Sequence, residues 1–211
     1  MRETLEKLAN LQVRAEPHIN FVPSILHRGY RVRTTSAGFH LRPASETFHE
    51  YLLAVVKWSF GERWWNCQRG LRPDERHVVV QWTYCLSEYT KKNSDVAHRK
   101  PNGQTYQAEA PGPIWALVTF GYDLFCLQAV NSLPESVIDQ LRHPKSFQSH
   151  RYLVAVAAIM VRAGFPIEFL DEVVKNEKHC EFIARDKYTE IVCAVEAKSR
   201  VRPGVLHARG I

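Results

Sequence analysis

The chain has 211 residues, 45% of them hydrophobic, so it can form a folded core and is not wholly disordered. Its formal net charge of +6 favours a polyanionic partner such as nucleic acid, although charge alone does not establish one. The five cysteines contain no Cys-x-x-Cys pair, which argues against a zinc site and for reduced thiols. No signal peptide and no membrane-spanning run is recognisable, so we expect a soluble cytoplasmic protein without a membrane partner.

Residues 1–145 are predicted to form a mostly helical region of unassigned role. Residues 1–13 carry apolar side chains at helical spacing and indicate a short amphipathic helix. The segment 16–43 contains several prolines and glycines and indicates a loop with a small hairpin. Two helices should follow, one with Ser45 as its N-cap and one opened by Pro73. The polar stretch 91–112 is rich in turn formers and predicts a mobile loop or linker.

Two further helices are expected before the composition changes. Pro113 begins the first of them, and Trp115 is expected on its apolar face. Ser132 and Glu135 have the spacing of a capping box, which predicts a short helix that ends near Arg142.

A second region, residues 146–211, follows a boundary near residues 142–146. Its first helix, 146–163, contains the run LVAVAAIMV, which is apolar on all sides and is therefore expected to be buried against a sheet. Short polar segments separate three strand candidates, which suits an antiparallel meander and an α+β fold. The candidates are Ile167–Val174, Cys180–Arg185 and Glu190–Lys198.

The last strand candidate ends in Glu196-Ala197-Lys198. Alternate residues of a strand face the same side, so Glu196 and Lys198 share one side. The strand is expected to be buried on both faces until Glu196, and its charged end then either leaves the core or builds a site. If the last two strands pair around the turn DKYT, Glu181 lies at the same end as Glu196, and the carboxylates can converge.

Two converging carboxylates beside an ammonium suit metal-dependent hydrolysis. Mg²⁺ or Mn²⁺ takes oxygen ligands, commonly one or two carboxylates with water and a substrate phosphate. Such an ion polarises a phosphodiester, and an ammonium orients the water or neutralises developing charge. Two ordinary interpretations stay open: a Glu-x-Lys pattern occurs readily by chance, and surface strands often carry Glu and Lys as solvated partners.

The segment 146–206 resembles the PD-(D/E)XK nuclease superfamily in its stretches RYLVAVAAIMVRAGFPIEFLDE, CEFIA and AVEAKSRVRPGV. The resemblance implies a partial restriction-endonuclease-like core of α-β-β-β order. Glu181 then matches the Asp of the PD element, and Glu196 and Lys198 match the E-x-K. The family adds the backbone carbonyl of Ala197 as a metal ligand and implies Mg²⁺-dependent hydrolysis, usually of DNA. A second copy or a partner chain would complete the sheet.

The leading prediction is therefore a metal-dependent endonuclease with Glu181, Glu196 and Lys198 as its catalytic residues. Arg200 and Arg202 follow without an acidic neighbour and are candidates for holding phosphates, with a solvated basic tail as the equal alternative. The alternative function is a non-catalytic nucleic-acid-binding or assembly module that keeps an incomplete nuclease-like core.

Overall fold

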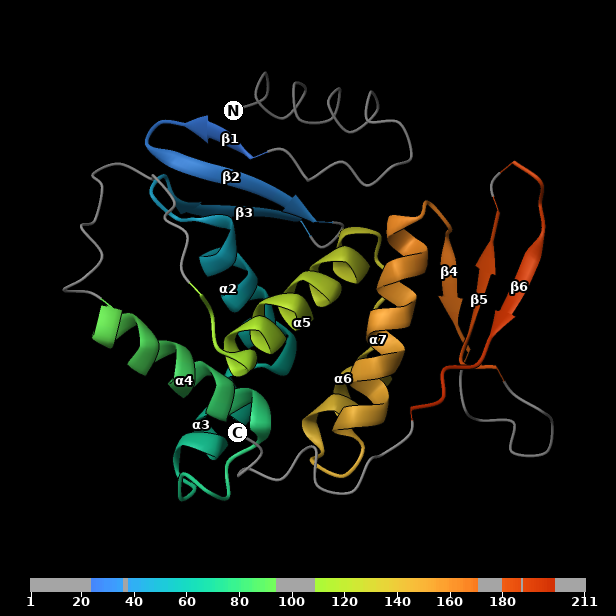
Figure 1. Cartoon of the computed structure of the whole chain (residues 1–211). Helices are drawn as coiled ribbons and strands as arrows, with labels where there is room; N and C mark the ends of the chain where they lie inside the picture. The colour runs from blue at the N-terminus through green and yellow to red at the C-terminus, as the bar shows by residue number, and fades with distance from the viewer. Residues whose placement is uncertain (1–23, 36–37, 94–108, 171–179, 187, 200–211) are drawn as a thin grey trace. The chain divides into compact units, whose positions relative to one another are not determined.

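The structure is a computed structural model that describes residues 24–35, 38–93, 109–170, 180–186 and 188–199 (Figure 1). The described residues form helices α2 to α7 and two three-stranded antiparallel sheets, so the predicted α+β class is confirmed. The helix predicted for residues 1–13 lies outside the described residues. Residues 94–108, which are most of the loop predicted for 91–112, also lie outside them.

The chain divides into two compact units. Unit 1 comprises residues 1–46, 123–134 and 152–198, and unit 2 comprises 47–122, 135–151 and 199–211. This division does not test whether residues 146–211 fold as one domain. The predicted boundary near residues 142–146 therefore stays a prediction.

Unit 1 contains the first sheet, which is larger than the small hairpin predicted there. Its strands are β1 (Ile25–His27), β2 (Tyr30–Thr35) and β3 (Gly38–Pro43), paired in the order β1-β2-β3. The β1–β2 turn consists of Arg28 and Gly29, with φ angles of 49° and 78°. Two left-handed residues match the twist of the flanking strands, which explains the tight connection.

Unit 1 also contains the second sheet and the end of α7 (Phe147–Arg162) that leads into it. The strands β4 (Ile167–Phe169), β5 (Phe182–Arg185) and β6 (Val192–Val195) pair in the order β4-β5-β6, all antiparallel. The predicted order of one helix and three meandering strands is therefore confirmed, with each strand shorter than expected.

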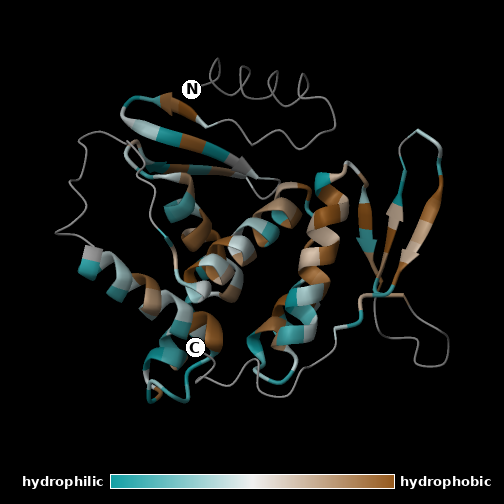
Figure 2. Ribbon diagram, in the orientation of Figure 1, coloured by the Kyte–Doolittle hydropathy of each residue, from teal (hydrophilic) through white to brown (hydrophobic). Residues whose placement is uncertain are grey.

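Only one face of the second sheet is buried. Phe182 and Ala184 are completely buried. The centroids of the Phe182 and Phe169 rings are 5.6 Å apart. On β6, by contrast, Val192 is 50% exposed although the strand is apolar (Figure 2). The prediction that the last strand is buried on both faces is wrong, because β6 is an edge strand with one open face.

The helix α7 is also less buried than its composition suggests. It runs beside β4 (Figure 1) and ends at Gly164, whose φ of 89° suits a C-cap. Ile159 is 55% and Tyr152 is 46% exposed, so the prediction of burial on all sides is wrong. A single helix at the surface of a unit buries a stripe rather than its whole circumference. The buried positions of its unit 1 part are Leu153, Val154, Ala157, Ala158 and Val161.

Unit 2 is helical, and its first three helices differ from the sequence prediction. The α2 helix (Phe48–Phe60) is capped by Thr47, whose hydroxyl accepts from the Glu50 amide, so Ser45 is not the N-cap. The α3 helix (Glu62–Arg69) was not predicted. The α4 helix (Val78–Asn93) begins five residues after Pro73, which lies in a turn.

The remaining helices are α5 (Gly112–Ala129) and α6 (Glu135–Arg142). Both were expected, but Trp115 is 64% exposed and does not belong to the apolar face of α5. Ser132 is not the N-cap of α6, because the helix begins at Glu135; its hydroxyl donates to the carbonyls of Val130 and Ile167.

Candidate functional site

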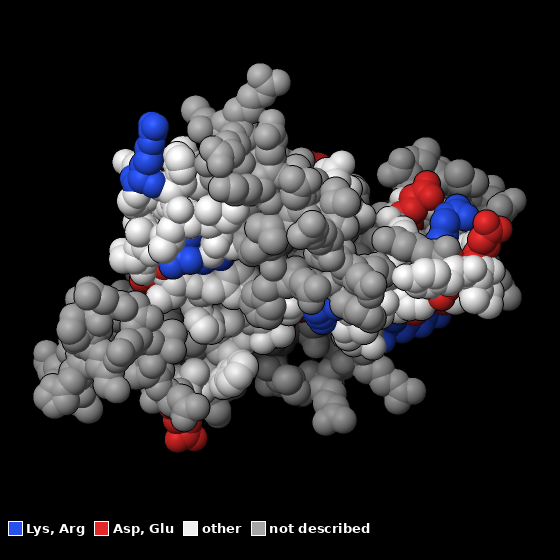
Figure 3. Space-filling view, turned by 90° about the horizontal axis from the view of Figure 1, so that it is seen from above, with Lys and Arg blue, Asp and Glu red and all other residues white. Residues whose placement is uncertain are grey.

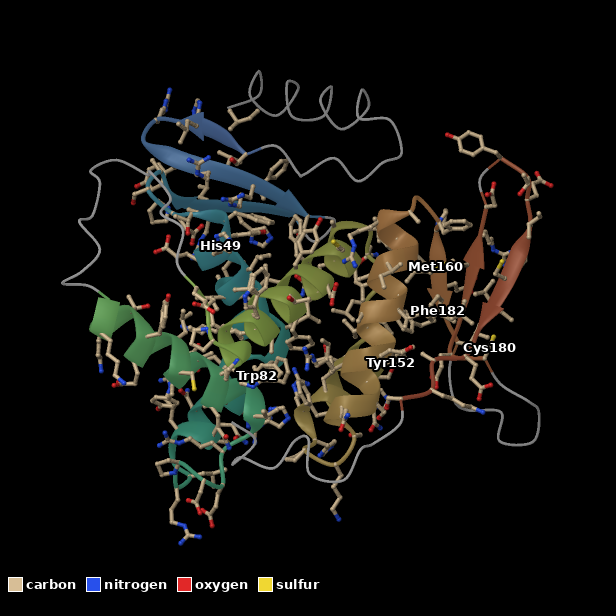
Figure 4. All side chains as sticks on the ribbon, in the orientation of Figure 1. His49, Trp82, Tyr152, Met160, Cys180 and Phe182 are labelled. Carbon is tan, nitrogen blue, oxygen red and sulfur yellow. The ribbon has the colours of Figure 1, made fainter. Side chains whose placement is uncertain are left out.

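The backbone of Glu181 is held by both neighbouring strands of the second sheet. Its amide donates to the carbonyl of Val195 over 2.8 Å, and its carbonyl accepts from the amide of Leu170 over 3.1 Å. Figure 4 labels Cys180 and Phe182, the residues on either side of Glu181. Because Phe182 is completely buried, the residue before it has a fixed position at the end of β5.

Glu196 lies at the same end of the sheet as Glu181. Phe182 pairs with Val195, and the two glutamates come directly before and after that pair. Continuing the strand register would pair Glu181 with Glu196. The Glu181 amide instead donates to the carbonyl of Val195, so regular pairing of the two strands ends at this point. The two glutamates that the sequence singled out therefore lie at one end of the sheet, and the convergence of their carboxylates stays a prediction.

Lys198 forms an ion pair with Glu196, with 2.9 Å between Nζ and Oε1. The side chains of Glu196 and Lys198 are 53% and 78% exposed, and they continue the exposed alternation of Val192 and Ala194. The glutamate and the lysine therefore share the open face of β6. A pair this exposed contributes about 0–1 kcal/mol, so either partner can exchange its contact for another ligand at small cost.

The donor set limits which metal this end of the sheet can hold. The described residues contain no cluster of three or more His, Cys, Asp and Glu side chains that could ligate a metal. Glu181 and Glu196 would supply two carboxylates, and the Ala197 carbonyl a third oxygen. Such a set suits Mg²⁺ or Mn²⁺, which keep waters and share a substrate phosphate, and does not suit a structural zinc. Arg200 and Arg202 lie outside the described residues.

The turn between β5 and β6 is fixed by Asp186. Its Oδ1 accepts from the amides of Tyr188 and Thr189 over 2.7 and 2.8 Å. The bond from the Thr189 amide and then that from the Tyr188 amide lower the pKa of Asp186. This turn defines how β6 returns along β5, and it thereby places Glu196 at the opposite end from the turn.

Acidic and basic groups alternate on the second sheet away from the two glutamates. Arg185 of β5 and Glu168 of β4 approach to 3.8 Å, and both are more than half exposed. Seen from above, red and blue atoms occur together at this sheet (Figure 3). The described part of this sheet therefore carries both signs of charge.

His77 is a buried group that sequence reasoning did not single out as special. It immediately precedes α4, and its Nδ1 accepts from the Val79 amide over 3.3 Å. Its ring contacts those of Phe60, Trp64 and Phe147, with centroids 6.0, 5.2 and 4.7 Å away. Burial, and secondarily the charge of His143, lowers the pKa of His77 to about 4. A neutral imidazole that caps a helix inside an aromatic cluster has a structural role.

Comparison with protein-family models, with curated proteins and with solved structures finds no match for this chain. In the part of the chain that the structure describes, no helix has the length and apolarity to span a membrane. Functional inference therefore depends on the residues and their geometry.

Proposed function

We propose that the chain is a metal-dependent nuclease that hydrolyses phosphodiester bonds, with DNA as its substrate. The observation that carries this proposal is the end of the β5–β6 pair. Glu181 and Glu196 flank the pair Phe182–Val195, and Lys198 forms an ion pair with Glu196. Two carboxylates and an ammonium at an exposed strand end can reach a substrate as large as nucleic acid.

Each residue has a defined part in the proposed reaction. Glu181, Glu196 and the Ala197 carbonyl would hold Mg²⁺ or Mn²⁺, which supplies Lewis-acid polarisation of the phosphate. Hydrolysis joins a water oxygen to phosphorus and breaks one phosphorus–oxygen ester bond. The Lys198 ammonium would neutralise the charge that develops on the phosphoryl oxygens.

The resemblance to the PD-(D/E)XK superfamily supports the same proposal. The order of α7, β4, β5 and β6 agrees with the α-β-β-β core that the resemblance implies. In this interpretation β6 is an open edge, and a second copy or a partner chain would add the missing part of the sheet. The five cysteines are free thiols, which is consistent with the cytoplasmic location that we propose.

The test is cleavage of supercoiled plasmid DNA by the full chain with Mg²⁺ or Mn²⁺, with EDTA as the metal-free control. We expect nicking by the wild type and a loss of at least about 100-fold in rate for Lys198→Ala and Glu196→Gln. Glu168→Gln and Lys57→Ala are the matched controls, because they remove exposed charges elsewhere. Equal cleavage by Lys198→Ala and the wild type contradicts the proposal.

The second candidate is a non-catalytic nucleic-acid-binding or assembly module. It is favoured by the contact that already engages Glu196 with Lys198 and by the lack of a larger ligand cluster among the described residues. Titration with Mn²⁺ separates the two functions. Binding that disappears in a Glu181→Gln/Glu196→Gln variant supports the nuclease, whereas equal weak binding by both proteins supports the module.

A further inference from the structure

The last strand of the second sheet, β6, has a free edge in the part of the chain that the structure describes. It pairs with β5 on one side and is the outermost strand of the order β4-β5-β6 (Figure 1). Its residues Val192–Val195 are all apolar, with no proline or charged residue among them. Ile191 and Val192 are 59% and 50% exposed. An apolar edge strand without such protection is a template for pairing with another strand.

The backbone groups of β6 alternate between β5 and the free edge. The carbonyls of Ile191 and Val195 accept from amides of the residues that flank β5, over 2.9 and 2.8 Å. Because alternate residues of an antiparallel strand bond to the same neighbour, the amides and carbonyls of Val192 and Ala194 point to the free edge. An added strand would therefore form its hydrogen bonds at these two residues.

The charges at the two ends of this segment make it complementary to its own reversed copy. Glu190 lies before β6 and Lys198 lies after it, and both are exposed. Two copies related by a two-fold axis pair their edges antiparallel, so the start of one segment meets the end of the other. An acid at one end and a base at the other then attract each other twice. This self-complementarity favours a second copy of the chain over an unrelated partner.

Two registers centre the contact on the apolar residues of β6 and pair backbone groups that face the free edge. If Val192 pairs with Ala194 of the second copy, Glu190 lies opposite Glu196, and like charges meet twice. If Ala194 pairs with Ala194 of the second copy, Glu190 lies opposite Lys198, and opposite charges meet twice. Charge therefore selects the register that is centred on Ala194.

The register centred on Ala194 also matches apolar side chains on the other face of β6. It places Ile191 opposite Ala197 and Cys193 opposite Val195 of the second copy. Glu190 has a φ of 59°, which is not a strand conformation. Its contact with the lysine of the second copy is therefore one between side chains at the end of the ladder.

We propose that the free edge of β6 pairs with β6 of a second copy of this chain, with Ala194 on the two-fold axis. The second sheets of the two copies then form one continuous sheet. Lys198 lies between Glu196 of its own chain and Glu190 of the second copy, so the second copy contributes a carboxylate beside the candidate catalytic residues. This pairing requires neither a metal ion nor cleavage of a substrate.

The first test is sedimentation velocity of the full chain at several concentrations, in EDTA and without nucleic acid. We expect a reversible dimer for the wild type and a monomer for Ala194→Pro, because proline removes an amide that faces the free edge and is not bonded to β5. Glu190→Lys is expected to raise the Kd of the dimer at least about tenfold, because two attractions per dimer become repulsions. Glu168→Lys makes the same charge change at an exposed position of β4 and, as the matched control, should leave Kd unchanged.

The second test identifies the register by disulfide formation, in a background in which the exposed Cys67 and Cys85 are replaced by Ser. Directly opposite residues of a hydrogen-bonded pair have Cα atoms about 5.5 Å apart, which a disulfide can span. The two Cys193 residues would be diagonal neighbours about 7–8 Å apart, which is too far. Oxidation with diamide should therefore link Cys193→Ser/Ala194→Cys into a dimer, and should link neither Cys193→Ser nor the chain that keeps Cys193.

Three results would overturn the proposal. One is a wild type that stays monomeric up to about 100 μM. Another is a dimer that Ala194→Pro and Glu190→Lys leave unchanged, which would assign the dimer to another surface. The third is a disulfide through Cys193, which would assign the other register. A monomer that cleaves plasmid DNA contradicts this proposal alone, and a dimer without cleavage contradicts the nuclease alone, so the two failures are distinguishable.

Discussion

The two sheets share a topology but differ in how completely they cover their apolar side chains. Both are three-stranded antiparallel meanders whose strands follow chain order. The second sheet buries Phe182 completely and exposes Glu196, as a sheet on a protein core normally does. The first sheet buries Val32 but exposes Phe39 on the same side, and it half-buries Arg42 on the other. Strand order therefore does not tell which face of a sheet is available to a partner, and the exposure of individual side chains does.

The strongest test of this comparison is a matched pair of phenylalanine truncations. Phe182→Ala is expected to lower the free energy of unfolding by about 3–5 kcal/mol, because it opens a cavity on the buried face. Phe39→Ala is expected to change it by less than about 1 kcal/mol, because Phe39 is 57% exposed. Urea unfolding of both variants provides the measurement. Similar losses would mean that the first sheet buries Phe39 in solution and that the comparison is wrong.

The next largest effect is the decrease in the free energy of unfolding at low pH, which is expected to come from His77 in unit 2 rather than from the sheets. Because the pKa of His77 falls from 6.5 to about 4 on folding, the folded state keeps the imidazole neutral while the unfolded chain protonates it. Stability is therefore complete above about pH 6.5 and decreases as the pH falls toward about 4, by up to about 3 kcal/mol.

Urea unfolding at several pH values, with His77→Asn beside the wild type, measures this contribution. Asn keeps an acceptor for the helix N-terminus but does not titrate, so the variant should show a shallower pH dependence. His49→Asn, at an exposed position, is the control. Parallel curves for the wild type and His77→Asn would contradict a buried neutral His77. In the first sheet, burial and then the charge of Arg42 also lower the pKa of His40, so a residual slope in the variant is expected.

The smallest expected effect concerns Arg28 in the turn between β1 and β2 of the first sheet. Arg28 has a φ of 49°, a left-handed conformation that Asn adopts more easily than Arg. Arg28→Asn is therefore expected to raise the free energy of unfolding by less than about 1 kcal/mol. A rise in the thermal midpoint measures it, and a decrease would mean that the Arg28 side chain stabilises the turn through contacts of its own.

Local patterns were sufficient to predict the elements that have strong end signals. The antiparallel meander after α7 followed from short apolar runs separated by polar turns, and the shared end of Glu181 and Glu196 followed from antiparallel pairing. The start of α4 was missed because Pro73 is also a turn residue. The N-cap of α2 was misplaced because Ser45 and Thr47 are both good capping residues, and the side-chain bond with Glu50 selects Thr47.

The sequence by itself determined the α+β class, the helix and three strands of the second sheet, and the position of the Glu-x-Lys motif at a strand end. These depend on periodicity and turn chemistry, which act over a few residues. Tertiary structure alone decided which face of each element is covered. Ile159 and Phe39 are exposed although they are apolar, and Arg42 is half-buried although it is charged. Burial depends on neighbours that are distant in the chain, so local composition does not specify it.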